Sequence, residues 1–208
     1  MSPRPLATVR TTFPQADVAG VRIRQATLLS DNWYHLFRYE YDLRLPDGSW
    51  QGQTREAYDR GNGATVLLFN RQRRTVVLTR QFRLPAYVSG DTDGWLLETA
   101  AGLLDADDPE SAIRREAMEE TGYRIERLTP VFDLFMSPGS VTERLHFFVG
   151  EYDPSDRPGR GGGADGENEN IEVVEIGFDE ALQMVRDGRI VDAKTVLLLY
   201  HARIEGLL

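Results

Sequence analysis

Hydrophobic and polar positions divide the chain into segments with strand-like and helix-like periods. Residues 64–69 and 75–83 are apolar runs joined by the polar turn 71–74, which indicates a hairpin of two buried strands. Residues 33–43 are rich in aromatics and alternate roughly between apolar and polar, as a half-buried strand does. After a Pro-Asp-Gly turn signal, residues 49–56 can return beside them, so the pattern predicts a small antiparallel sheet near the N-terminus.

The second half of the chain alternates between strands and helices. The sequence predicts a loop at residues 86–94, followed by a short strand at 95–100. A helix is expected to start at the cap Asp179 and to end at Gly188, and a last helix covers residues 192–202. Further strands are expected within 125–135, at 142–150 and at 171–176. Strands on both sides of one central helix, followed by two terminal helices, predict helices packed on both faces of a mixed sheet.

The central helix carries a row of glutamates. Asp108 suits the N-cap position, and Gly122 suits the left-handed residue that ends a helix. Between them, Glu116, Glu119 and Glu120 point to one side at helical spacing. Like charges on one face repel unless cations sit between them, and carboxylate oxygens are ligands that Mg²⁺ takes. The spacing alone leaves a metal site and a solvated acidic helix face both open.

Composition narrows the possible partners. The 208 residues carry a net charge of −9, which argues against nucleic acid or an anionic membrane as partner. A phosphate-bearing substrate must therefore be met by local arginines and by metal. The chain has no cysteine, so disulfides, cysteine nucleophiles and thiolate zinc sites are excluded. We expect a cytoplasmic protein, because the sequence shows neither a membrane-spanning apolar run nor a signal-peptide core.

A glycine loop followed by Arg-Glu-x-x-Glu-Glu-x-Gly resembles the signature of the Nudix hydrolases. The family's arginine falls on Arg115, and its closing glycine falls on Gly122. Its metal-binding glutamates fall on Glu116, Glu119 and Glu120. The resemblance implies the Nudix fold, an α/β/α sandwich with a mixed sheet, here preceded by the small antiparallel N-terminal sheet.

The loop before this helix departs from the family's usual pattern. It has one residue fewer between Gly102 and Arg115, and the glutamate usual in the loop appears as Asp107 or Asp108. The departure concerns the contact made by that loop carboxylate and leaves the glutamate helix intact.

Within the Nudix family, the chain looks most similar to the GDP-mannose pyrophosphatases. The segments that carry this similarity are residues 29–32, 55–65, 80–83, 100–105, 136–139, 146–148 and 192–199. The similarity implies hydrolysis of GDP-mannose, a nucleotide sugar, to GMP and mannose 1-phosphate. It also implies Mg²⁺, with Mn²⁺ as a substitute, and a homodimer that exchanges its N-terminal sheets.

The same similarity assigns roles to individual residues. Arg115, Glu116, Glu120 and Glu169 are expected to be catalytic, and the metal ligands are expected to be Ala101, Glu116, Glu119, Glu120 and Glu169. Residues expected to bind substrate are Trp33, Arg55, Glu56, Arg83, Ala101, Gly102 and Leu103, the first three from the partner subunit. Glu169 would be a base on the glycine-rich loop 153–170. Because this loop looks longer than in its relatives, Glu167 remains an alternative.

These expectations divide the chain into a flexible arm (residues 1–20), a dimerising N-terminal sheet (21–58) and a Nudix hydrolase domain (59–208). Two other functions stay open. An ADP-ribose pyrophosphatase would share the metal helix and differ around the base and the sugar. A non-catalytic Nudix domain that binds nucleotides should have lost part of the Arg-Glu-x-x-Glu-Glu motif, which is complete here.

Overall fold

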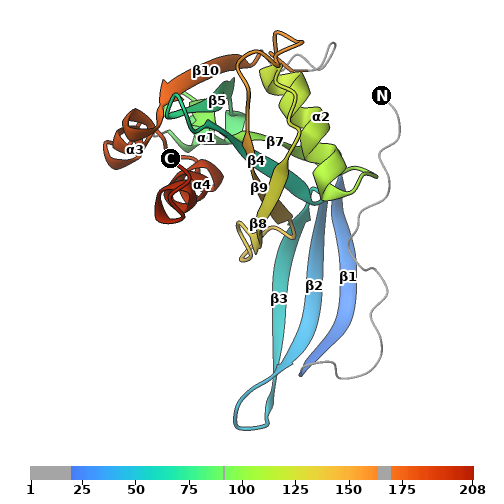
Figure 1. Cartoon of the computed structure of the whole chain (residues 1–208). Coiled ribbons are helices and arrows are strands. Elements are labelled where there is room, and N and C mark those ends of the chain that lie inside the picture. The colour runs from blue at the N-terminus through green and yellow to red at the C-terminus, as the bar shows by residue number, and fades with distance from the viewer. Residues whose placement is uncertain (1–19, 91, 164–169) are drawn as a thin grey trace. The chain divides into compact units, whose positions relative to one another are not determined.

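The computed structural model describes residues 20–90, 92–163 and 170–208, and the chain divides into two compact units (Figure 1). The N-terminal unit consists of the chain up to Asn62 together with Phe135–Arg144. The C-terminal unit consists of Gly63–Leu134 and Leu145–Leu208. The flexible arm predicted for residues 1–20 lies, except for Gly20, outside the described residues.

The N-terminal unit is a three-stranded antiparallel sheet in the order β1-β2-β3, with β1 at Val21–Asp31, β2 at His35–Arg44 and β3 at Trp50–Asp59. The predicted hairpin is confirmed as β2 and β3, whereas β1 was not predicted. Two register shifts interrupt the pairing of β1 with β2, and they disturb the alternation by which a strand is read from sequence. Phe37 and Tyr39 are the buried apolar side chains of the described part of this unit.

The C-terminal unit is built on a seven-stranded mixed sheet in the order β10-β5-β4-β9-β8, with β6 paired to β5 and β7 paired to β4. Strand β9 runs parallel to β4, and β5 and β7 run antiparallel to it. The strands are β4 (Gly63–Asn70), β5 (Thr75–Phe82), β6 (Trp95–Glu98), β7 (Ala100–Leu103), β8 (Leu128–Phe135), β9 (Arg144–Glu151) and β10 (Glu172–Gly177).

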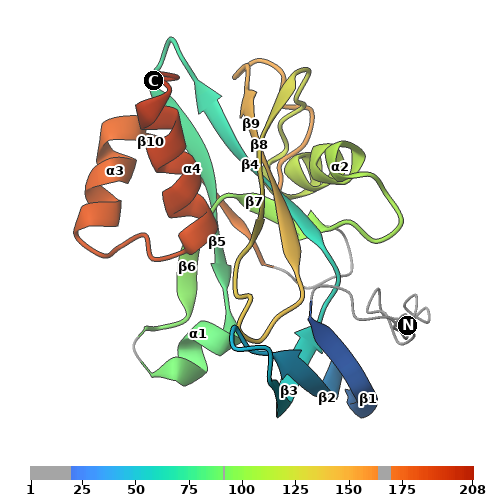
Figure 2. The same cartoon turned by 90° about the horizontal axis from the view of Figure 1, so that it is seen from below.

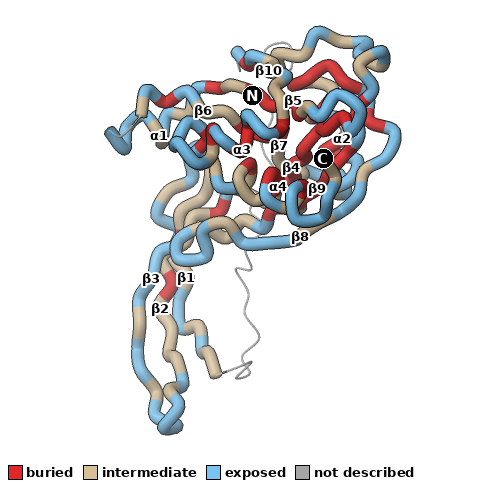
Figure 3. The backbone as a smooth tube through the Cα atoms, turned by 60° about the vertical axis from the view of Figure 1, so that its left-hand side comes forward, coloured by how far each residue is buried: buried red, intermediate tan, exposed pale blue. Residues whose placement is uncertain are grey.

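Helices cover both faces of this sheet (Figure 2). Helix α2 (Pro109–Thr121) packs on one face, and helices α3 (Phe178–Arg186) and α4 (Ala193–Ile204) lie on the other. Strand β4 is buried along its whole length because it lies between these layers (Figure 3). The predicted α/β/α sandwich is therefore confirmed.

Three local predictions differ from the structure. The expected loop 86–94 contains a short helix, α1 (Leu84–Ser89), which has a proline in its first turn and ends at Gly90 with φ of 89°. The expected strand 95–100 is two strands, β6 and β7, which separate at Thr99 and pair with different neighbours. Asp179 lies in the first turn of α3, whose N-cap is Gly177, so the predicted cap is wrong by two residues.

Candidate active site

The caps of helix α2 set the position of its glutamates. The Asp108 carboxylate accepts hydrogen bonds from the backbone N–H groups of Glu110 and Ser111, each at 3.1 Å. Gly122 adopts a left-handed conformation with φ of 79°, and its N–H donates to the carbonyl of Met118 at 2.9 Å. Both predicted ends of the helix are thus present for the expected physical reasons.

Asp107 and Asp108, the two residues that could replace the usual loop glutamate, make different contacts in the structure. Asp108 caps the helix, whereas the Asp107 Oδ2 atom lies 3.7 Å from Nε of Arg115. Asp107 is therefore the carboxylate of the shortened loop that faces the arginine of the motif.

Gly102 allows the Glu116 carboxylate to lie directly against strand β7. A Cβ atom at residue 102 would lie 2.1 Å from Cδ of Glu116, which is far inside van der Waals contact. Glycine is needed here for space, because any side chain would push the carboxylate away from the strand. The packing of α2 on β7 therefore fixes one carboxylate at the glycine that sequence reasoning had placed in a loop.

Glu120 lies one helical turn further along and is only 4% exposed. Its Oε2 atom accepts a hydrogen bond from the backbone N–H of Ala101 at 3.3 Å. Glu116 and Glu120 thus meet neighbouring residues of the same strand from the same helix. This places two carboxylates beside the backbone at Ala101, as the predicted metal site requires.

Arg115 balances part of this negative charge. Its Nη1 atom lies 2.9 Å from the Glu116 carboxylate and 3.1 Å from the Glu119 carboxylate. Burial acts to lower the pKa of Arg115, but the two glutamates outweigh it, so the pKa is raised. Arg115 therefore stays charged and holds Glu116 and Glu119 on the same side of the helix.

The donor set fits a hard divalent cation. Glu116 and Glu120 supply carboxylate oxygens, and the Ala101 carbonyl belongs to the strand that both approach. In the described ranges, no three acidic or histidine side chains form a complete ligand group. The predicted loop carboxylate, Glu169 or Glu167, lies outside the described residues.

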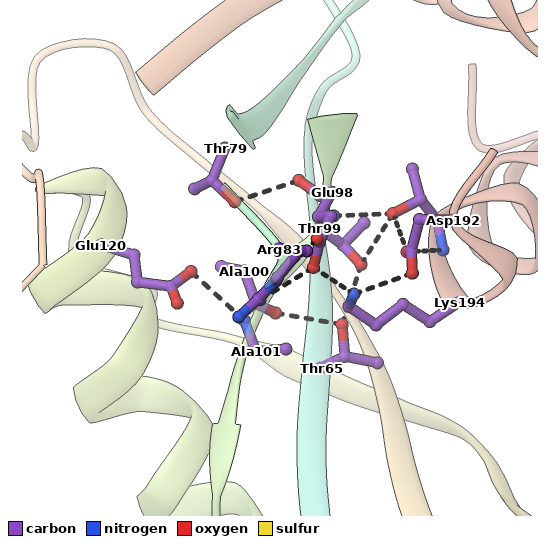
Figure 4. Close-up of polar contacts among 11 residues, drawn as sticks. Thr65, Thr79, Arg83, Glu98, Thr99, Ala100, Ala101, Glu120, Asp192 and Lys194 are labelled. Atoms are coloured by element: carbon purple, nitrogen blue, oxygen red, sulfur yellow. Dashed lines mark hydrogen bonds and ion pairs between the residues drawn. The ribbon is translucent and has the colours of Figure 1, made fainter. Parts of the chain in front are cut away.

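Arg83 forms a paired contact with a buried glutamate that was not predicted (Figure 4). Its Nε and Nη2 atoms donate to the two oxygens of Glu98 at 2.8 and 2.9 Å. Glu98 is 2% exposed, and its second oxygen also accepts from Nζ of Lys194 at 2.5 Å. Burial would raise the pKa of Glu98, but the hydrogen bonds from Arg83 and the charge of Lys194 lower it to about 2.

A hydroxyl network connects this ion cluster to the break between β6 and β7. Asp192 caps α4, lies 3.0 Å from Nζ of Lys194, and accepts the hydroxyl of Thr195 at 2.7 Å. The Thr195 hydroxyl in turn accepts the backbone N–H of Thr99 at 2.7 Å. The first turn of α4 therefore holds the chain at the point where β6 ends with Glu98 and β7 begins.

Sequence reasoning missed Glu98 and Lys194, although one signal was available. Lys194 is the only lysine among the 24 basic residues of the chain. A chain that uses arginine elsewhere and keeps one lysine indicates a position where a compact ammonium group is required.

The remaining predicted residues lie in two places. Leu103 is in β7, beside Gly102. Trp33, Arg55 and Glu56 belong to the N-terminal unit, and all three are exposed. Their contact with nucleotide stays a prediction.

Comparison with known proteins identifies the class. Residues 59–198 match the NUDIX domain family, and residues 20–58 match a family described as the GDP-mannose pyrophosphatase NudK N-terminal domain. The chain therefore belongs to the Nudix family, as predicted. Nudix hydrolases generally use divalent metal ions, which agrees with the carboxylates on α2.

Two relatives that are similar in sequence carry the same name. A GDP-mannose pyrophosphatase of Pectobacterium atrosepticum is 55% identical over 186 residues, which cover 89% of this chain and 95% of the relative. Another, of Klebsiella pneumoniae, is 52% identical over 189 residues, which cover 91% and 94%. A solved ADP compounds hydrolase shares the fold, with a TM-score of 0.65 over 90% of this chain at 19% identity. No helix in the described residues is long and apolar enough to cross a membrane.

Proposed function

We propose that this protein hydrolyses the diphosphate of GDP-mannose and releases GMP and mannose 1-phosphate. The observation that carries the proposal is the placement of Glu116 and Glu120 on Ala101 and Gly102 of β7, within a complete Nudix motif. The sugar nucleotide is taken from relatives that are 52–55% identical over about nine-tenths of the chain.

The metal would be Mg²⁺, which Mn²⁺ can replace. Ala101, Glu116, Glu119, Glu120 and Glu169 are the proposed ligands. When bound, the metal neutralises charge on the diphosphate and lowers the pKa of a coordinated water.

The other site residues position the substrate or move a proton. Arg83 can bind a phosphate through the face of its guanidinium that Glu98 leaves open, because its side chain is partly exposed. The backbone of Gly102 and Leu103 is proposed to line the diphosphate. Glu169, or Glu167 as the alternative, is proposed to accept the proton of the attacking water.

A substrate panel tests the reaction. GDP-mannose, ADP-ribose and other nucleotide sugars are compared with product analysis, in the wild type and in Glu120→Gln. We expect GMP and mannose 1-phosphate from GDP-mannose, and a loss of several orders of magnitude in kcat for Glu120→Gln. Glu110→Gln removes a charge from the first turn of the same helix and is the matched control. Preferential cleavage of ADP-ribose, or normal turnover by Glu120→Gln, would overturn the proposal.

The loop base has its own test. Glu169→Gln is expected to lower kcat with little change in substrate binding. If Glu167→Gln is the damaging change instead, the base is Glu167, two residues earlier in the sequence, and if neither variant is affected the base lies elsewhere.

We also propose the division into an arm (residues 1–20), a dimerising sheet (21–58) and a hydrolase domain (59–208), with cytoplasmic action. The N-terminal unit exposes Leu28, Leu29 and Trp33, with Trp33 60% exposed. Burial of such apolar surface in a two-fold interface is favourable. Trp33, Arg55 and Glu56 would then contact the nucleotide bound by the partner.

Mixing two inactive variants tests the shared site. Arg55→Ala and Glu120→Gln chains should regain activity when their subunits exchange, because one of the two hybrid sites is intact. A monomer by light scattering, or exchange without rescue, would refute this arrangement.

A further inference from the structure

The C-terminal end of helix α2 is electrostatically unfavourable. Three carboxylates, those of Glu116, Glu119 and Glu120, lie within its last two turns, and its last turn contains no basic residue. The carbonyl end of a helix carries partial negative charge, and neighbouring like charges repel. Arg115, in the preceding turn, offsets part of the charge of Glu116 and Glu119, and the rest of this helix end, including its last carbonyls, needs compensation from elsewhere in the chain.

Residues 157–163, which we call the glycine clamp, supply that compensation. Two of its backbone N–H groups reach the carbonyls of the glutamate residues themselves: Gly162 donates to Glu120 at 2.8 Å, and Gly163 donates to Glu119 at 3.1 Å. Two further contacts complete the cover, from the N–H of Gly159 to the Gly122 carbonyl at 3.3 Å and from Nε of Arg157 to the Thr121 carbonyl at 3.2 Å. In Figure 1 this segment runs between β9 and β10, beside α2.

Glycine is required on both sides of this contact. A Cβ atom on Gly161 would lie 2.5 Å from the carbonyl oxygen of Glu120 and 2.7 Å from the carbonyl carbon of Thr121. A Cβ atom on Gly122 would lie 2.3 Å from the carbonyl oxygen of Gly159. In both cases the added Cβ atom would meet backbone atoms, so the clash could not be relieved by a change in a flexible side chain. Gly161, the first of three consecutive glycines, thus permits close packing at this point of the loop.

Arg157 anchors the clamp by a second contact. Its guanidinium carbon lies 4.9 Å from the ring centroid of Tyr123, which is buried beneath it. A cation over an aromatic ring is attracted to its face, and a cation at the carbonyl end of a helix is favoured. Arg157 therefore places positive charge where α2 itself has none.

We propose that the glycine clamp is a positioning element of the active site, which fixes the backbone of Glu119 and Glu120 and so maintains the geometry for divalent cation binding. The clamp and the proposed metal site are connected through a single residue. The clamp binds the carbonyl of Glu120, and the carboxylate of Glu120 accepts the N–H of Ala101. A displaced helix end would move Glu120 relative to β7. The inference rests on the proposed function in taking Glu120 as a metal ligand.

Mn²⁺ binding without substrate, followed by electron paramagnetic resonance, tests the clamp directly. Gly161→Ala is compared with Gly188→Ala. Both glycines have a positive φ, 71° and 77°, so alanine introduces similar backbone strain at the two positions. Only Gly161→Ala adds an atom against the helix, since nothing lies within 4 Å of a Cβ on Gly188. We expect Gly161→Ala to weaken Mn²⁺ affinity by about tenfold or more, and Gly188→Ala by less than about twofold.

Two further variants, Arg157→Gln and Glu120→Gln, separate a failure of the clamp proposal from a failure of the metal assignment. Arg157→Gln removes the cation without adding an atom and should weaken Mn²⁺ affinity several-fold with little change in Tm, so it decides the matter if Gly161→Ala fails to fold. If Glu120→Gln loses Mn²⁺ while Gly161→Ala and Arg157→Gln bind like Gly188→Ala, the clamp proposal is overturned. If Glu120→Gln itself binds Mn²⁺ normally, the metal assignment is what fails.

Discussion

Replacing Glu98 by glutamine should destabilise the protein in a pH-dependent manner. The amide has nearly the same size but no charge, so Arg83 and Lys194 lose the carboxylate that they share. Lowering the pKa of Glu98 from 4.5 to about 2 corresponds to about 3 kcal/mol in favour of the folded state at neutral pH. Removing one partner of a buried ion cluster typically costs about 3–5 kcal/mol, which is the same order.

The sign of the pH dependence follows from the direction of that pKa shift. The carboxylate is more acidic in the folded state, so its contribution is complete above pH 4.5 and is lost as the pH falls toward 2. With these pKa values, wild type should lose about 0.8 kcal/mol of the contribution by pH 4 and about 2 kcal/mol by pH 3. The stability difference between wild type and Glu98→Gln should therefore shrink over this range.

Urea unfolding at pH 7, 5, 4 and 3.5 measures this difference. Glu172→Gln is the matched control, because Glu172 pairs with Arg80 at 3.3 Å but both side chains are exposed. Such a pair contributes only about 0–1 kcal/mol. A Glu98→Gln penalty that is as small as the control, or that is the same at pH 7 and pH 3.5, would refute the assignment of Glu98 as a buried anion.

The effect on activity can be separated from the effect on stability. If Glu98 acts on the reaction by orienting Arg83, Glu98→Gln should lower kcat in wild type but add little in an Arg83→Ala background. Selective ¹³C labelling of lysine gives a single Lys194 signal, since the chain has no other lysine, and this signal should shift in Glu98→Gln. Multiplicative losses in the double variant would contradict the orienting role.

Two further substitutions test the strand that faces α2. Gly102→Ala places a Cβ atom 2.1 Å from Cδ of Glu116 and should reduce turnover by at least about a hundredfold, with an unchanged circular dichroism spectrum. Normal activity would show that Glu116 can move without consequence. Thr195→Val removes the hydroxyl that accepts the Thr99 N–H and should cost about 1–3 kcal/mol in urea unfolding, because that N–H is buried. A loss below that range would mean that the strand break is held by other contacts.

Helix α2 could be predicted closely because its determinants are local. Asp108 lies two and three residues from the N–H groups it caps, and Gly122 directly follows the last helical residue. The row of glutamates follows from the helical period alone. Local chemistry was sufficient for the element that carries the proposed metal ligands.

The break between β6 and β7 could not be predicted in the same way. Residues 95–100 are expected from the sequence to form one short strand, but the chain divides at Thr99, whose N–H is accepted by a hydroxyl 96 residues away. The same long-range arrangement brings Lys194 to Glu98. No periodicity within residues 95–100 encodes either contact.

The glycine-rich loop shows the limit of composition as evidence. The sequence shows only that this loop is rich in glycine, and the structure packs residues 157–163 against the backbone of α2. Composition does not distinguish a glycine that confers freedom from one that permits close approach. That distinction appears only when the neighbouring backbone is known.

The charges gathered around β7 support the proposal that this site takes a divalent cation. Three cations and six carboxylates meet there, namely Arg83, Arg115 and Lys194 with Glu98, Asp107, Glu116, Glu119, Glu120 and Asp192. The excess is three negative charges, and Arg83 and Lys194 are already neutralised by Glu98 and Asp192. A diphosphate would add further negative charge to a surface that the protein's own cations do not balance. The ion cluster at Glu98 therefore fixes where Arg83 points, while in the proposed reaction the charge that accepts the diphosphate would come from a metal held by the glutamates of α2.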